Sequence, residues 1–305
     1  MDNLDHGLAV SAVGWMWLGR ASTLDPGFTL RQHGACIIKL TRHRFWAATV
    51  LVLSGWCGTP QGLDGQSSEV VIRVLTYNIR HGAGMDDSVD LRRAAAVINA
   101  VRPDIVALQE IDSATSRTDH VDQATRLGAL TRMRAAFGGF MGYRDGQYGM
   151  AILSRHPILA STNHRLPDGL EPRTALGVTT QVEGMATPMV VVGIHLYATE
   201  EERLAQARRL TEIFEGEQLP VLLVGDFNSE PGSAVIEHLA QQWSIPAKSP
   251  PTLTFPADVP EREIDYIMLR PASQFEVIEV RVVEEVMASD HRPVLLVVRW
   301  RGEQD

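Results

Sequence analysis

Short apolar runs alternate with amphipathic segments along residues 70–300, and the spacing of the apolar positions predicts which segments are helices and which are strands. In the segment 91–101, Leu91, Ala95 and Ile98 recur at helical spacing, and Pro103 follows the segment's end. Helices are predicted at residues 91–101, 123–133, 200–217 and 234–241. Strands are predicted at residues 70–79, 105–110, 149–153, 175–182, 189–196, 221–224, 264–269, 275–283 and 294–300.

Several predicted strands are apolar along nearly their whole length, and residues 221–224 contain only Val and Leu. Strands of this composition are covered on both faces, so helices should pack outside the sheets. The pattern therefore predicts an α/β layered sandwich.

Polar side chains interrupt or follow these apolar runs at a small number of places. A carboxylate at a buried strand end is costly unless another group pairs with it. Several such positions in one domain therefore predict a common site. The candidates are Asn78, Gln109, Glu110, His195, Asp226, Asn228, Asp265, Asp290 and His291.

Each of these residues has a simpler explanation when it is taken alone. Asn78 could cap a turn, residues 226–228 could form an Asx turn, and His195 could be a structural histidine. Asp265 is harder to explain in this way, because its neighbours are apolar and an inward carboxylate needs a partner such as an imidazole N–H. Their joint order along the chain favours a site.

Composition and charge narrow the classes of function. The chain has 305 residues, 45% of them hydrophobic, and a formal net charge of −9. Residues 1–57 hold five Lys or Arg and three Asp or Glu, whereas the remainder holds 23 and 34. An acidic body does not attract phosphate backbones, which disfavours tight nucleic-acid binding. Both cysteines, Cys36 and Cys57, precede residue 58, which excludes thiolate-bound zinc and an internal disulfide from the rest of the chain.

Residues 1–58 are predicted to be an N-terminal extension with a signal or lipoprotein-like segment at 45–57. A basic stretch precedes an apolar segment whose length is typical of a signal peptide and short for a bilayer span. Trp56, directly before Cys57, is unfavourable for lipoprotein processing. The alternative is a buried helix over 45–56.

Residues 59–69 contain turn formers and almost nothing to bury, which predicts a linker. One folded domain is then expected at residues 70–301. With a signal segment the protein is expected to be exported, with membrane association through its N-terminal segment as one form of export. Without a signal it is expected in the cytoplasm.

A set of short motifs carries a resemblance to a known family. Their order resembles that of the endonuclease/exonuclease/phosphatase superfamily over about residues 70–300. The sequences of the motifs at 76–82 and 148–157 are most similar to those of bacterial exported members. The resemblance implies a four-layer α/β/β/α sandwich of two packed mixed sheets with outer helices, and phosphoester hydrolysis with a divalent metal. The motifs are TYNIRHG (76–82), LQE (108–110), YGMAILSRHP (148–157), HL (195–196), GDFN (225–228), IDY (264–266) and SDH (289–291).

The resemblance also implies a metal site. Glu110 matches the principal ligand of Mg²⁺, or of Mn²⁺, and Asn78 and Asp290 match residues close to the ion or its waters. Hard oxygen ligands suit these two ions. Arg80 departs from the abasic-site nucleases of the family, which carry an acidic residue at this position. The departure argues against a close likeness to those repair enzymes.

The catalytic residues that the resemblance implies are a second group. His291, oriented by Asp265, matches an imidazole that activates water or stabilises the pentacovalent phosphorus. Asp226 and Asn228 match a pair that positions the attacking water and a phosphate oxygen, and His195 matches a second imidazole near the phosphate.

Arg173 precedes a predicted strand and could donate two hydrogen bonds to a phosphate oxygen pair. A surface arginine without such a role is the alternative.

The predicted function is metal-dependent hydrolysis of a small or lipid-linked phosphodiester, such as a phospholipid head group. A secreted endonuclease acting on nucleic acid is the alternative enzyme. A catalytically silent binding module is the alternative outside enzymes, and it is disfavoured because Glu110, Asp226 and His291 are all retained. No protein partner is inferred.

Overall fold

The structure is a computed structural model that describes residues 69–302. The predicted extension, its signal segment at 45–57 and nearly all of the linker lie outside the described residues. None of the helices within 69–302 has the length and apolarity needed to cross a membrane.

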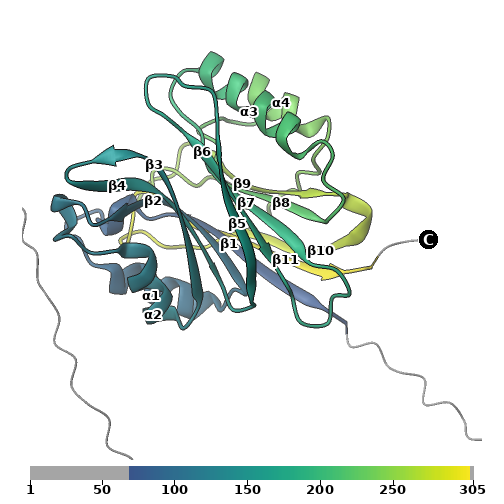
Figure 1. The fold of residues 1–305 in the computed structure, drawn as a ribbon, viewed down its shortest axis with the longest axis horizontal. Helices are drawn as coiled ribbons and strands as arrows, with labels where there is room; N and C mark the ends of the chain where they lie inside the picture. Colours follow the sequence, from purple (N-terminus) through teal and green to yellow (C-terminus); the bar gives the residue numbers. More distant parts are fainter. Residues whose placement is uncertain (1–68, 303–305) are drawn as a thin grey trace, which may run out of the picture. The chain divides into compact units, whose positions relative to one another are not determined.

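Two mixed sheets pack face to face, and helices cover their outer faces (Figure 1). This arrangement confirms the predicted α/β sandwich of two packed sheets with outer helices. The first sheet has the strand order β10-β11-β1-β2-β4-β3, and the second has the order β5-β6-β7-β8-β9. The pairs β1/β2 and β7/β8 are parallel, and all other neighbours are antiparallel.

The elements follow one another in chain order, with three short 3-10 helices between them. The strands of the first sheet are β1 (Val71–Asn78), β2 (Ile105–Ser113), β3 (Arg134–Tyr143), β4 (Gly146–Ser154), β10 (Phe275–Val282) and β11 (Val294–Trp300). The strands of the second sheet are β5 (Ile158–Arg165), β6 (Thr174–Thr180), β7 (Met189–His195), β8 (Val221–Asp226) and β9 (Asp265–Arg270). The helices are α1 (Leu91–Val101), α2 (Gln123–Thr131), α3 (Glu200–Phe214), α4 (Ala234–Ala240), η1 (Arg80–Gly82), η2 (Ser116–Thr118) and η3 (Ala272–Gln274).

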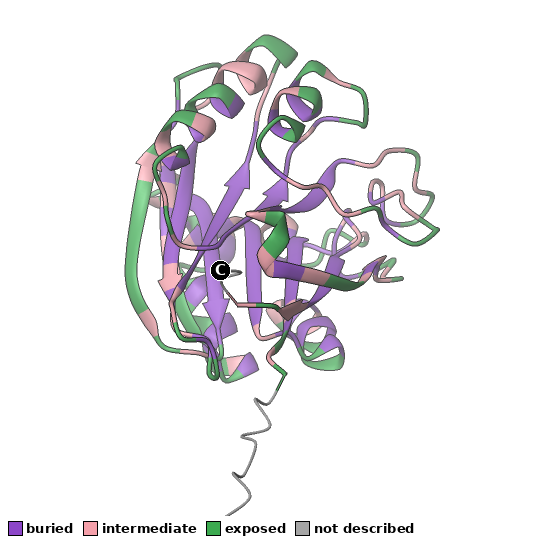
Figure 2. Cartoon of the chain, turned by 90° about the vertical axis from the view of Figure 1, so that its right-hand side faces the viewer, coloured by how far each residue is buried: buried purple, intermediate pink, exposed green. Residues whose placement is uncertain are grey.

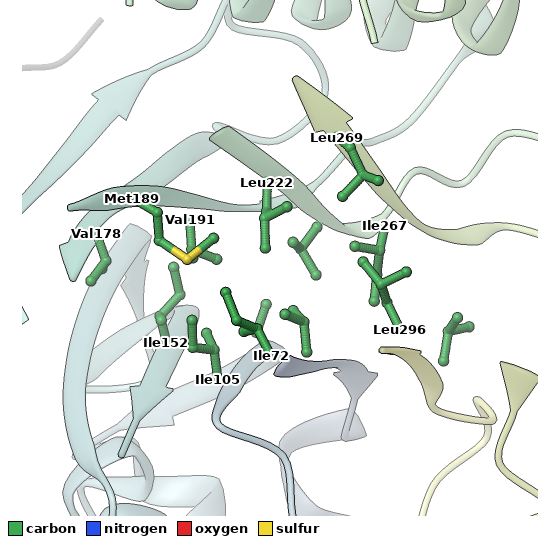
Figure 3. Packing of buried hydrophobic residues seen from close by; sticks show 14 of the residues in the cluster. Ile72, Ile105, Ile152, Val178, Met189, Val191, Leu222, Ile267, Leu269 and Leu296 are labelled. Atoms are coloured by element: carbon green, nitrogen blue, oxygen red, sulfur yellow. The ribbon is translucent and has the colours of Figure 1, made fainter. Parts of the chain in front are cut away.

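Three apolar clusters fill the spaces between the four layers. Side chains alternate between the faces of a strand, so Leu222 of β8 points into the cluster between the sheets and Leu223 points towards α3 and α4. Figure 3 shows the cluster between the sheets, with Ile72 and Ile152 on one side and Val191 and Leu222 on the other. Burial on both faces explains why these strands are apolar throughout (Figure 2).

Two strands were not predicted, and each has a physical reason. The strand β5 is exposed at most positions because it forms the edge of the second sheet, so it lacks an apolar pattern. The strand β3 contains Gly138, Gly139 and Gly142, which weaken strand propensity. The segment is a strand because it pairs with β4. Three predicted helices also end earlier than expected, α2 at Thr131, α3 at Phe214 and α4, by one residue, at Ala240.

Candidate active site

Three strands of the second sheet align three of the predicted site residues. His195 ends β7 and lies opposite Asp226, which ends β8, and Asp226 lies opposite Asp265, which begins β9. Residues that face each other on neighbouring strands are close in space. All three side chains are buried, so the sheet sets a row of an imidazole and two carboxylates at one end of the sandwich.

The first sheet contributes Asn78 and Glu110. Asn78 ends β1 and lies opposite Gln109 of β2. Glu110 was expected at the end of a strand, but β2 continues to Ser113, and Glu110 lies at a shift in register with φ +60°. A bulge of this kind changes the direction of a side chain, and a non-glycine residue with positive φ is costly unless its surroundings hold it. The bulge therefore places the Glu110 carboxylate in the site.

The amide of Asn78 joins the two sheets. Its Nδ2 donates to Glu110 Oε1 at 3.1 Å and to Asp226 Oδ2 at 3.2 Å. The same nitrogen lies 3.5 Å from His291 Nε2. Four predicted residues from four separate motifs thus meet at one atom.

His291 is held by the loop before β11 and by Asp265. Its Nδ1 lies 3.0 Å from Asp265 Oδ2, and Ser289 Oγ donates to the backbone oxygen of Asn78 at 2.7 Å. The ring of Phe255 packs on the imidazole with its centroid 4.8 Å away. Asp265 is therefore the partner that fixes the orientation of His291.

Burial and neighbouring charges shift the pKa values of His291 and Asp226. Burial by itself lowers the pKa of His291, but the carboxylates of Asp265 and Asp226 outweigh it and raise that pKa to about 10. Burial, with Asp265, raises the pKa of Asp226 to about 7, and the charge of His291 opposes this rise. Because His291 Nε2 lies 3.7 Å from Asp226 Oδ2, a proton stays within the pair at neutral pH.

His195 lies on the other side of Asp226. Its Nε2 is 3.5 Å from Asp226 Oδ2. Burial first, and then the positive charge of Arg173, hold the pKa of His195 well below its usual value. His195 is therefore a neutral imidazole at neutral pH.

Asn228 adopts a left-handed backbone, with φ +48°. Its N–H donates to Asp226 Oδ1 at 2.8 Å, and its side-chain Nδ2 donates to the backbone oxygen of Leu196 at 2.9 Å. The first bond fixes Asp226 Oδ1, while Asp226 Oδ2 lies near the two imidazoles.

Arg173 is not the surface arginine of the alternative interpretation, because only 1% of the residue is exposed. Its Nη1 donates to Glu171 Oε2 at 2.9 Å, and its guanidinium lies 4.8 Å from the ring centroids of both Phe140 and Tyr197. A buried guanidinium between two aromatic rings is a rigid donor for an anion.

A cavity of about 360 Å³ opens over these groups. Of the predicted residues, Asn78, Gln109 and Asp265 are not part of its lining. Half of the lining residues were not predicted from the sequence. The prediction used polar residues at the ends of apolar strands, and most of the missed residues are aromatic or arginine side chains in a hairpin or a loop. The lining is Glu110, Arg117, Met141, Tyr143, Tyr148, Glu171, Arg173, His195, Tyr197, Asp226, Asn228, Phe255, Asp290 and His291.

The donor set fits a hard divalent cation. Burial raises the pKa of Glu110, and the nearby charge of Asp290 raises it further, so these carboxylates would gain from a cation. Their oxygens are the kind of ligand that Mg²⁺ and Mn²⁺ prefer. Asn78 turns its Nδ2 towards Glu110, and its Oδ1 accepts from the N–H of Arg80 at 3.1 Å.

Ligand atoms of Asp226, Asp265 and His291 form a second close group, within 4.8 Å of one another. The contact between His291 Nδ1 and Asp265 already engages two of them. The metal set of Glu110, Asn78 and Asp290 therefore stays a prediction.

Arg80 occupies the place of the acidic residue found in abasic-site nucleases. Its Nη2 pairs with Asp87 at 2.9 Å, and its Nε lies 3.8 Å from Asp290. A positive charge thus lies beside one of the two carboxylates predicted to bind the metal.

Proteins of known sequence or structure are similar to this chain over most of its length. The chain is 28% identical over 252 residues to the Escherichia coli protein YbhP, which covers 76% of this chain and 98% of YbhP. A functionally unknown conserved protein of Enterococcus faecalis superposes with a TM-score of 0.64 at 23% identity, over 75% of this chain and 100% of that chain. A Bacteroides thetaiotaomicron mannosyl-6-phosphatase gives a TM-score of 0.62 at 18% identity, over 74% and 99%.

At these identities the two solved structures show the fold alone. The family model described as Endonuclease/Exonuclease/phosphatase family matches residues 75–291, which span every predicted site residue from Asn78 to His291. Members of that family are phosphoester hydrolases. The chain belongs to the endonuclease/exonuclease/phosphatase family.

Proposed function

We propose that this protein is a divalent-metal-dependent phosphodiesterase that acts on a small or lipid-linked phosphodiester by in-line attack of water. One observation carries the proposal. The Asn78 amide joins Glu110, Asp226 and His291 at the base of a small cavity. A silent binding module has no need for this group of buried, mutually bonded titratable residues.

The chain's own residues can position water and move its proton. Asp226, with a pKa raised to about 7, can accept a proton from water near neutral pH. His291, kept protonated by Asp265, can neutralise charge that develops on the phosphate oxygens. Arg173 can donate to a phosphate oxygen beside neutral His195. A cation held by Glu110, Asn78 and Asp290 supplies Lewis-acid charge neutralisation when bound.

The size and charge of the site favour a small substrate. A cavity of about 360 Å³ accommodates a phosphate and part of its alcohols, whereas a nucleic-acid strand needs a longer basic groove. The acidic body after residue 57 gives no such electrostatic support. The mannosyl-6-phosphatase among the structural relatives makes a phosphomonoester the first comparison substrate.

The test is turnover of bis(p-nitrophenyl) phosphate and of p-nitrophenyl phosphate by the full chain with Mg²⁺ or Mn²⁺. We expect the diester to be hydrolysed, EDTA to stop turnover, and His291→Ala to lower kcat by about 10²- to 10⁴-fold. The exposed His120→Ala is the matched control and should keep full activity. Turnover that needs no metal, or that survives His291→Ala, would contradict the proposal.

A panel of sphingomyelin vesicles, inositol phosphates and plasmid DNA under the same metal control then ranks the substrates. Cleavage of plasmid alone would favour the secreted endonuclease. Binding of ligands without hydrolysis of any of them would favour the silent module.

Export is part of the proposal and rests on the apolar segment at 45–57. The full chain and a variant without residues 45–57, expressed in a bacterium, should differ in fractionation. We expect the full chain in the periplasmic, extracellular or membrane fraction and the shortened chain in the cytoplasm. Equal cytoplasmic recovery would refute export.

A further inference from the structure

Arg117 lies where two cavities meet. It lines the catalytic cavity and also an adjacent hollow of about 260 Å³ formed by η2, the start of α1 and the helix α2. Two more arginines, Arg92 and Arg126, line that hollow. The two cavities therefore share Arg117, and three arginines line the second one together with two carboxylates, Asp90 and Asp119.

A buried carboxylate holds Arg117 rigidly. Its Nε and Nη2 donate to Asp112 at 2.6 and 2.7 Å, and Asp112 is fully buried. Thr115 Oγ1 donates to the same carboxylate at 2.7 Å. Within residues 69–302 the remaining nitrogen, Nη1, makes no hydrogen bond to the protein. A guanidinium fixed on two nitrogens offers its third without a further loss of side-chain entropy.

The ring of Tyr148 lies close to this guanidinium and to that of Arg173. Arg117 lies 5.4 Å and Arg173 lies 6.0 Å from the ring centroid of Tyr148. The side chain of Arg173 is 2% exposed and that of Arg117 is 20% exposed. Arg173 is thus the more deeply buried of the two donors.

The same arrangement disfavours a cationic head group such as choline. Tyr143 already has Arg117 at 4.6 Å and Arg144 at 5.5 Å from its ring centroid. A quaternary ammonium would need an aromatic face free of other cations, and it would approach two guanidinium groups.

We infer that Arg117, with the hollow beyond it, is a binding site for a second anionic group on the substrate. The site selects phosphoesters whose alcohol carries another phosphate a few ångströms from the bond that is cleaved. Arg173 holds the phosphate that reacts, and Arg117 Nη1 receives the second one as a charge-assisted hydrogen bond. This inference rests on the proposed function for the identity of the reacting phosphate, but the anion site itself can be measured without turnover.

The experiment is titration calorimetry on the full chain with matched ligands. One pair is glycerophosphoinositol and glycerophosphoinositol 4-phosphate, and the other is adenosine 5′-monophosphate and adenosine 3′,5′-bisphosphate. We expect the member with the second phosphate to bind about tenfold more tightly in at least one pair. The pair that shows the preference distinguishes a polyol alcohol from a nucleoside. Equal affinities within both pairs would overturn the inference.

Variants assign the preference to Arg117. Arg117→Gln should reduce to about one the ratio of affinities for the ligands with and without the second phosphate. Arg117→Lys should reduce this ratio as well, because an ammonium bound to Asp112 lacks the separate free nitrogen of a guanidinium. The lysine variant keeps a charge beside buried Asp112, so it serves if the glutamine variant does not fold. The exposed Arg209→Gln, in α3, is the control and should keep the wild-type ratio. A preference that survives both Arg117 variants would refute the assignment.

The outcomes separate the two proposals. A preference for the second phosphate without metal-dependent turnover of bis(p-nitrophenyl) phosphate would keep the anion site and reject the proposed function. Turnover with equal affinities would keep the function and reject the site.

Discussion

At the scale of single residues, the site depends on which charges lie next to one imidazole. Asp265 is in contact with Nδ1 of His291, and Asp226 lies near Nε2 of the same ring. The resemblance in sequence pairs Asp265 with His291, but the high pKa that this pairing produces follows from burial of all three groups together.

The substitution Asp265→Asn tests this effect, because an amide oxygen can still accept from Nδ1–H but carries no charge. We expect the pKa of His291 to fall from about 10 towards its ordinary value and kcat to fall by about 10²- to 10⁴-fold. Nuclear magnetic resonance titration of the histidine ring protons in metal-free protein measures the pKa. The exposed Asp258→Asn is the control, and an unchanged His291 titration in Asp265→Asn would contradict the assignment.

The same pKa predicts how stability depends on pH. The pKa of His291 in the folded state lies above the ordinary value of 6.5 for a histidine, so the protonated ring stabilises the fold. That contribution is complete below pH 6.5 and is lost as the pH rises towards 10. In urea denaturation without metal, the excess stability of wild type over Asp265→Asn should be largest near pH 6 and should shrink at higher pH. A constant difference would argue against the raised pKa.

Glu110 is predicted to favour function at the expense of metal-free stability. Partial burial raises the pKa of its carboxyl group, so Glu110→Gln should raise the free energy of unfolding in EDTA by about 1 kcal/mol. The variant should also lose the rise in Tm that Mg²⁺ or Mn²⁺ gives wild type. Thermal unfolding with and without metal measures both effects. A variant that keeps the metal-induced shift would remove Glu110 from the metal set.

At the scale of elements, loops and bulges decide where the predicted side chains point. The bulge in β2 sends Glu110 into the site, and the β5–β6 loop carries Arg173 into the cavity. Neither follows from the apolar pattern, because a bulge is fixed by pairing with β4 and the loop is fixed by a helix that follows much later in the chain.

Glu202 in the first turn of α3 anchors that loop. It forms a capping box with Thr199, and its Oε1 also accepts from the N–H of Leu170 at 2.8 Å. We expect Glu202→Ala to loosen the segment that carries Arg173, so that KM rises severalfold while kcat changes little. Steady-state kinetics on a phosphodiester measures the split. Glu201→Ala, an exposed neighbour, is the control, and a fall in kcat alone in Glu202→Ala would contradict the anchoring role.

At the scale of the whole molecule, the two sheets should unfold together because their shared core is continuous. Leu222 is fully buried between the sheets (Figure 3). Leu222→Ala should cost about 2–5 kcal/mol, in a single transition seen alike by tryptophan fluorescence and circular dichroism. Leu159→Ala on the exposed edge strand β5 should cost less than about 0.5 kcal/mol. Two separate transitions in the Leu222 variant would show that the sheets unfold independently.

The sequence by itself determined the layered α/β class, most of the helices and strands, and the residue types of the site. It could do so because strands buried on both faces are apolar throughout, and because the motifs keep a recognisable order. The tertiary structure alone decided that Asn78 Nδ2 joins Glu110 to Asp226, that Arg173 is buried, and that Arg117 lines two cavities. These features depend on distances between segments far apart in the chain, and local patterns of apolar and polar residues do not encode such distances.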